Sequence, residues 1–87
     1  MQIKNPKLRK MMDAAGYEKF GLWRGEGYCY VYSDDPECNA MLNCLYSTSI
    51  YCCYFNQMSV EDWFEEISHI IETAKTAYAE GNYGVNV

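Results

Sequence analysis

The sequence predicts an α+β fold in one domain, residues 1–87, with helices packed on a three-stranded mixed β-sheet in the order α-β-β-α-β-α. Two segments start with Asn or Asp followed directly by proline and continue with apolar residues at helical spacing. Two short aromatic-rich runs flank a glycine-containing turn. A later segment keeps the helical apolar pattern for about five turns. Because the chain has only 87 residues, we expect no second domain.

The first helix is expected over residues 6–15. Asn5 is suited to cap the free backbone amides, and Pro6 at the first helical position sacrifices no hydrogen bond. Gly16 is suited to end the helix because glycine adopts the left-handed conformation easily. The apolar stripe at i, i+3, i+4 and i+7 consists of Leu8, Met11, Met12 and Ala15.

A β-hairpin is expected next, with strands at 20–24 and 27–33 joined around Gly25 and Gly27. Alternation along the second strand places three tyrosines on one face: Tyr28, Tyr30 and Tyr32. We expect this tyrosine ladder to belong to the core or to a protein interface. The alternative is a small nucleic-acid-binding module, in which the ladder stacks bases beside a basic first helix. The bases of that helical region are Lys4, Lys7, Arg9 and Lys10.

A second helix is expected over 36–46, with Asp35 as its cap and Pro36 at its first position. Residues 49–55 contain no polar side chain after the first, which is typical of a strand covered on both faces. We therefore expect this segment to be the central strand. The helix before it leaves room for a right-handed crossover, so the second and third strands are expected to run parallel.

The last helix is expected over 60–80 and is the strongest structural prediction. Ser59 is suited to cap it, with Asp62 reaching back to form a capping box, and Gly81 is suited to end it. Residues 82–87 are expected to be a frayed tail.

The net charge of −5 is unevenly distributed along the chain. The residues through Arg24 sum to +4, and those from Gly25 onward sum to −9. The acids expected to bind a partner with a basic surface, together with the tyrosine ladder, are Asp34, Asp35, Glu37, Glu61, Asp62, Glu65 and Glu66. The alternative is an ordinary solvated face. The two like-charge pairs that it contains at i, i+4 are unfavourable by a few tenths of a kcal/mol each.

Catalysis, cofactors and metals are not expected. His69 is the only histidine, and Glu66 stands three residues before it, a spacing that carboxylate-bridged metal sites use with matching ligands from other helices. No second pair of this kind exists, so a metal-dependent enzyme built on these two residues is the weakest hypothesis. The five cysteines show no regular spacing, and we expect all of them, including Cys52 and Cys53, to pack as free thiols.

No long apolar run follows the basic start of the chain, so we expect a cytoplasmic protein that does not enter a membrane. A homodimer that buries the tyrosine ladder is left open, because a three-stranded sheet has edges that a second copy could cover.

Two stretches carry a resemblance to known proteins: Gly25-Glu26-Gly27-Tyr28 through Tyr32-Ser33-Asp34-Asp35, and Tyr54-Phe55-Asn56-Gln57 through Trp63. The chain resembles, over roughly residues 6–75, small orphan accessory proteins carried by phages and prophages. That class includes inhibitors of host defence such as anti-CRISPR proteins. The resemblance implies an inhibitor that binds a nucleic-acid-handling host protein without catalysis, and it assigns a role to no individual residue.

Overall fold

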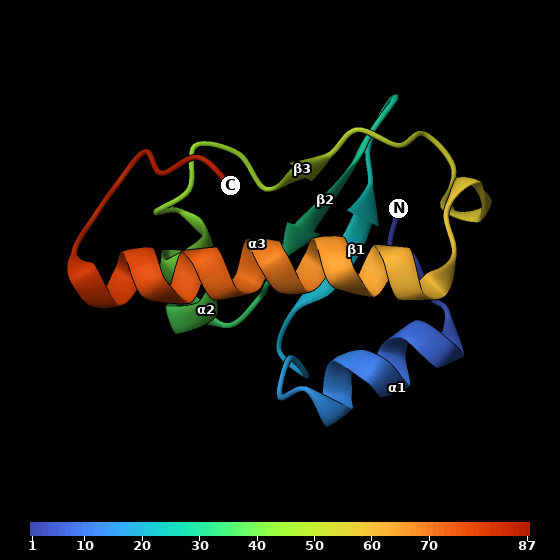
Figure 1. Ribbon diagram of the computed structural model, residues 1–87, viewed down its shortest axis with the longest axis horizontal. Helices are drawn as coiled ribbons and strands as arrows, with labels where there is room; N and C mark the ends of the chain where they lie inside the picture. The colour runs from blue at the N-terminus through green and yellow to red at the C-terminus, as the bar shows by residue number, and fades with distance from the viewer.

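The computed structural model describes residues 1–87 and confirms the α+β class and the order of the elements. Figure 1 shows α3 lying across one face of the sheet, with α1 and α2 on the same side of the molecule. The elements are α1 (Pro6–Ala14), β1 (Gly21–Arg24), β2 (Cys29–Tyr32), α2 (Pro36–Leu42), β3 (Ser49–Ile50), the 3-10 helix η1 (Phe55–Gln57) and α3 (Val60–Glu80).

The three α-helices begin where the capping residues predict. The side-chain oxygens of Asn5, Asp35 and Ser59 each accept a hydrogen bond from the backbone amide three residues later, at 3.0, 3.0 and 3.1 Å. Each bond satisfies an amide that has no partner within the helix. Gly81 ends α3 with a φ of 71°. The reciprocal capping-box bond expected from Asp62 does not form, so Ser59 caps α3 alone.

The sheet is antiparallel throughout, so the prediction of a mixed sheet was wrong in this respect. Its order is β1-β2-β3, which makes β2 the central strand. α2 has only seven residues and packs against α3 instead of crossing the sheet. The chain therefore re-enters beside the strand it has just left, with Ser49 opposite Tyr30 and Ile50 opposite Cys29.

The expected central strand 49–55 is instead the two-residue edge strand β3. Pairing stops at Ile50, whose carbonyl accepts a hydrogen bond from the amide of Cys52 at 2.8 Å in a tight turn. Two tyrosines of this segment lie at the surface: Tyr51 is 85% exposed and Tyr54 is 54% exposed. The apolar run predicted burial on both faces, but only Ile50 is buried in the core, while Cys52 and Phe55 are partly buried against it.

The core lies between α3 and the inner face of the sheet. On α3 the fully buried positions follow helical spacing and include Trp63, Ile67, Ile71 and Ala74. The sheet contributes alternate residues from its two longer strands, which are Leu22, Cys29 and Val31. α1 adds Leu8 and Met12 to the same cluster of 16 buried residues.

Both ends of the chain are tied to the body of the molecule. At the start, the amide of Ile3 donates to the carbonyl of Leu22 at 2.9 Å, which places the first residues alongside β1. The predicted frayed tail is wrong, because Val85 donates to Cys44 at 3.0 Å and accepts from Tyr46 at 2.8 Å. This pairing also explains why α2 ends at Leu42 instead of residue 46: the residues after it form a turn and a bridge with the tail.

Candidate functional site

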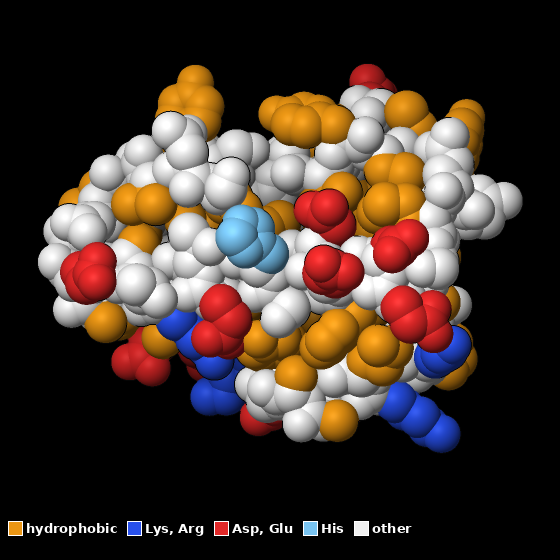
Figure 2. Space-filling view, in the orientation of Figure 1, with side chains coloured by type: hydrophobic (Ala, Val, Ile, Leu, Met, Phe, Trp, Pro, Cys, Tyr) orange, Lys and Arg blue, Asp and Glu red, His pale blue; other side chains and the backbone are white.

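A groove of about 730 Å³ runs between α1 and α3, and we call it the acidic groove. Figure 2 shows acidic side chains over the first half of α3, with apolar surface below them where α1 meets α3. Its lining consists of Met11, Glu61, Phe64, Glu65, Glu66, Ser68, His69 and Glu72.

The helical repeat of α3 forms the rim of the groove. Glu61, Glu65, Ser68 and Glu72 follow one another at i, i+4, i+7 and i+11, so their side chains share one stripe of the helix. Residues on the opposite side, such as Ile67 and Ile71, are completely buried in the core. Core packing therefore fixes the direction in which this row of acids points.

The floor of the groove is apolar and is held by a contact from outside α3. Phe64 is partly buried and stacks on Tyr17, with 6.2 Å between the ring centroids. The hydroxyl of Tyr17 donates to Glu72 Oε2 at 2.7 Å and lies 3.0 Å from Ser68 Oγ. Burial is the largest cause that raises the pKa of Tyr17. Tyr17 thus joins the loop after α1 to the middle of α3 and fixes one end of the groove.

The negative charge of the groove is only partly neutralised within the protein. Lys7 Nζ lies 2.6 Å from Glu61 Oε1, and Lys75 Nζ lies 3.8 Å from Glu72 Oε2. Glu65 and Glu66 line the groove, whereas Asp62 lies outside its lining. All three are exposed and form no ion pair. These carboxylates are free to meet cations from another molecule.

Replacing Lys7 by Gln is expected to raise the pKa of Glu61 toward its ordinary value of 4.5. The hydrogen bond from Lys7 is the largest cause that holds this pKa down. A lowered pKa in the folded state stabilises the fold above the ordinary value, and this stabilisation is lost as the pH falls through the lowered pKa. An NMR titration of the Glu61 carboxyl measures the change, with Lys10→Gln on the same helix as the control. An unchanged pKa in Lys7→Gln would contradict the assignment.

The acids around the start of α2 do not join the acidic groove. Asp35 caps α2 and lies 3.6 Å from Lys19, and its backbone and side-chain contacts with Cys38 are the main causes that lower its pKa. Asp34 and Asp35 line a different hollow, together with Glu18 and Lys19. Glu37 is exposed in the first turn of α2. Figure 1 shows α2 beside the C-terminal half of α3, away from the end where Glu61 lies.

The tyrosine ladder lies on the face of the sheet turned away from α3, outside the core cluster, and its members are half-buried. Tyr28 and Tyr30 have ring centroids 6.0 Å apart, and Tyr32 meets Trp23 edge to face at 5.7 Å. Trp23 was missed as a member of this face. Its position opposite Tyr30 in the hairpin register was the signal that could have identified it.

The bases of the first helical region are divided between two surfaces of the protein. α1 packs against α3, and two of its cations are already engaged inside the protein, Lys7 with Glu61 and Arg9 with Asp13. Arg9 lines one hollow together with Tyr32 of the ladder, and Glu18, Asp34 and Asp35 line the same hollow. Carboxylates at this place oppose the approach of phosphates.

The five thiols differ in burial, and His69 is exposed. Cys29, Cys38 and Cys44 are buried, and burial is the largest cause that raises the pKa of the first two thiols. Cys53 is exposed, so the expectation that it packs was wrong. His69 is exposed and shares no hydrogen bond with any cysteine, and no three His, Cys, Asp or Glu side chains lie close enough to hold a metal ion.

None of the helices combines the length and the apolar character needed to cross a membrane. Comparison of the chain with protein-family models, with curated proteins and with solved structures finds no match.

Proposed function

We propose that this protein is a non-catalytic binding protein that holds a basic segment of a partner protein in the acidic groove. The observation that carries the proposal is the combination of an apolar floor and a carboxylate rim in one groove between two helices. An acidic surface alone is common on proteins, but here the acids border a partly buried aromatic ring, Phe64. Such a groove suits a ligand that is both apolar and cationic.

The chemistry of the occupant follows from these groups. An apolar side chain of the partner would pack on Phe64 and Met11 and displace water from the floor. Arg or Lys side chains beside it would pair with Glu65, Glu66 and Asp62, which have no cation partner within the protein. Arginine suits this role best because its planar fork matches a carboxylate and its guanidinium also stacks on aromatic rings. Opposite charges would in addition speed the encounter of the two proteins.

Proteins that handle nucleic acids present such segments, since neutralising phosphates requires exposed Lys and Arg side chains. The resemblance to small phage and prophage accessory proteins favours the same class of partner. We therefore propose that the protein inhibits a nucleic-acid-handling host protein by occupying its basic surface. The acids of α3 take the place of phosphates in this inhibition.

A capture experiment with matched variants tests the proposal. Immobilised wild-type protein is expected to retain a basic host protein from an extract, and Glu65→Lys/Glu66→Lys is expected to lose it. The control Glu18→Lys/Glu26→Lys changes the net charge by the same amount at two exposed acids outside the groove. It should retain the protein.

The captured protein is then purified and titrated with nucleic acid in the presence of the wild type. Its affinity for nucleic acid is expected to fall as the concentration of the wild type rises. Equal loss of capture in both variants would show that only net charge matters. Unchanged nucleic-acid affinity would contradict the inhibitory role.

A further inference from the structure

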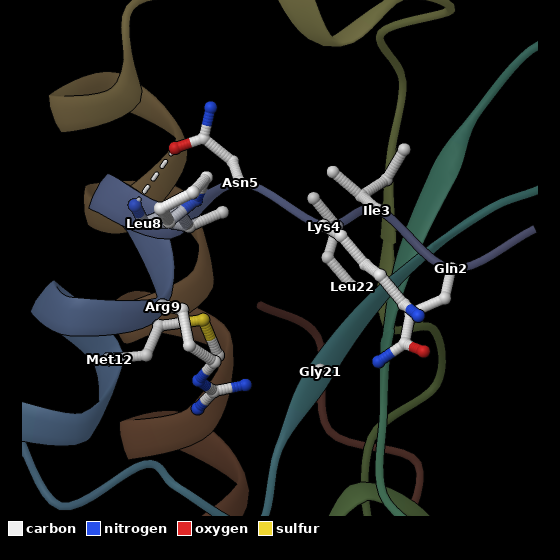
Figure 3. A pocket seen from close by; sticks show the side chains of 10 residues that line it. Gln2, Ile3, Lys4, Asn5, Leu8, Arg9, Met12, Gly21 and Leu22 are labelled. Atoms are coloured by element: carbon white, nitrogen blue, oxygen red, sulfur yellow. Dashed lines mark hydrogen bonds between the residues drawn. The ribbon is translucent and has the colours of Figure 1, made fainter.

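A second hollow, which we call the N-terminal pocket, lies between α1, β1 and the first residues of the chain, and it has a volume of about 380 Å³. That volume falls within the range of about 300–1,000 Å³ that is typical of small-molecule sites. Figure 3 shows the residues around it, which come from α1 on one side and from the strand segments on the other. The lining consists of Gln2, Ile3, Lys4, Asn5, Pro6, Leu8, Arg9, Met12, Gly21 and Leu22.

The inner wall of the N-terminal pocket borders the hydrophobic core. Leu8, Met12 and Leu22 belong to the core cluster, and Ile3 packs against that cluster. Gly21 also lines the pocket, and the ring of Tyr32 fills the space that a side chain at this position would take. An apolar ligand would therefore bury its body against residues that are already held in place by core packing.

Arg9 places a fixed guanidinium at the pocket. Its Nη1 and Nη2 donate to the backbone carbonyls of Phe20 and Tyr17, both at 2.9 Å, and its Nε donates to Asp13 at 2.9 Å. Each terminal nitrogen carries two N–H groups and uses one of them, so a second N–H on each nitrogen has no partner in the protein. The three existing bonds hold the guanidinium in one orientation, so little conformational entropy is lost when an anion binds.

A second cation stands on the other side of the pocket. Lys4 is exposed and forms no ion pair, and Figure 3 shows its side chain reaching toward that of Gln2 across from Arg9. The pocket thus has two cations beside an apolar interior, on a protein whose net charge is −5. Nearby acids limit the negative charge of the anion that can bind. Asp13 pairs with Arg9. Arg9 also lines a neighbouring hollow together with Glu18, Asp34 and Asp35.

We infer that the N-terminal pocket binds a small molecule with an apolar body and a single carboxylate. The body enters among Ile3, Leu8, Met12 and Leu22, and the carboxylate accepts the free N–H groups of Arg9 and pairs with Lys4. A single negative charge fits the two cations, whereas the nearby acids would repel a polyanion such as a nucleotide. This site is separate from the acidic groove and does not depend on the proposed function.

Three soluble probes with the same phenylbutyl body test the inference: 4-phenylbutyrate, 4-phenylbutan-1-ol and 4-phenylbutylamine. Titration by NMR is expected to shift the signals of Ile3, Leu8 and Leu22 with 4-phenylbutyrate. The carboxylate is expected to bind at least about tenfold more tightly than the alcohol, because hydrogen bonds to charged groups are stronger than those between neutral groups. The amine is expected to bind more weakly still.

The variant Lys4→Gln is expected to lower the affinity for 4-phenylbutyrate about two- to fivefold, which is the effect expected from the loss of an exposed ion pair. The control Lys10→Gln removes an exposed lysine of α1 that does not line the pocket, and it should leave the affinity unchanged. Equal affinities for the acid and the alcohol would overturn the carboxylate assignment. Absence of shifts at the pocket residues, or a larger effect of Lys10→Gln than of Lys4→Gln, would overturn the site.

Discussion

Replacing Trp63 by Ala is expected to lower the free energy of unfolding by about 3–5 kcal/mol, as is typical of large-to-small changes at buried aromatic residues. Trp63 is 0% exposed, and its indole Nε1 donates to the carbonyl of Phe55 at 2.6 Å. The two rings also stack with 5.4 Å between their centroids. The variant would therefore leave a cavity in the core and remove the hydrogen-bond donor of the Phe55 carbonyl. It would also release η1 from α3. Since small domains have only about 5–15 kcal/mol of stability, this loss would raise the fraction of unfolded molecules.

Trp23 offers a matched control, because it is the only other tryptophan and is 38% exposed on the outer face of the sheet. Trp23→Ala is expected to cost about 1 kcal/mol or less. Trp63→Phe should fall between the two, since it keeps most of the ring but leaves the Phe55 carbonyl without its donor. Urea denaturation followed by circular dichroism measures all three. A cost for Trp63→Ala no greater than that for Trp23→Ala would refute this account of the core.

The helices could be predicted from the sequence because their signals are local. Asn5, Asp35 and Ser59 act within one turn of their own helix, so the cap bond joins residues that are close in the sequence. The same local logic predicted the hairpin around Gly27, which adopts a φ of 79°. The end of α1 was predicted to within one residue, but that of α2 was misplaced by four. The bridge between Leu45 and Val85 involves residues forty positions apart.

The sheet was harder to predict because its pairing depends on distant contacts. The run from Ser49 to Phe55 has the composition of a buried strand, but a strand is buried only where another layer covers it. α3 covers only one face of the sheet, and the strand ends at Ile50. Tyr51 and Tyr54 remain at the surface. Composition measures how apolar a segment is, and it does not say which partner is present to cover it.

The acids of the candidate groove could be predicted from the sequence, but its floor could not, because the floor depends on distant contacts. Periodicity along α3 predicted that Glu61 and Glu65 share the polar side of the helix, and in the structure both line the groove. The floor could not be foreseen, since it needs Met11 from α1 and the stacking of Tyr17 on Phe64. Asp35 looked like part of the same acidic surface, but its carboxylate caps a helix elsewhere.

The second large effect is expected from Glu65→Lys/Glu66→Lys. This variant should lower the affinity for the proposed partner by at least about 100-fold and should also make the protein more stable. The loss of affinity follows because each reversal removes an attraction and adds a repulsion to the partner's cations, and close charge pairs at interfaces are worth about 2–5 kcal/mol. The gain in stability follows from the helix itself. Glu61 and Glu65, and Asp62 and Glu66, are like-charge pairs at i, i+4 that become opposite-charge pairs, for a total of about 1 kcal/mol.

Opposite changes in affinity and stability separate a binding role from a structural one. Isothermal titration with the captured partner and urea denaturation of the free protein measure the two quantities on the same variant. The control Glu18→Lys/Glu26→Lys should leave the affinity within about threefold, because exposed pairs contribute little. A variant that lost binding and stability together would point to unfolding of α3. A variant that gained stability and kept its affinity would show that the acids of α3 repel one another without serving a partner, and the proposed function would then be wrong.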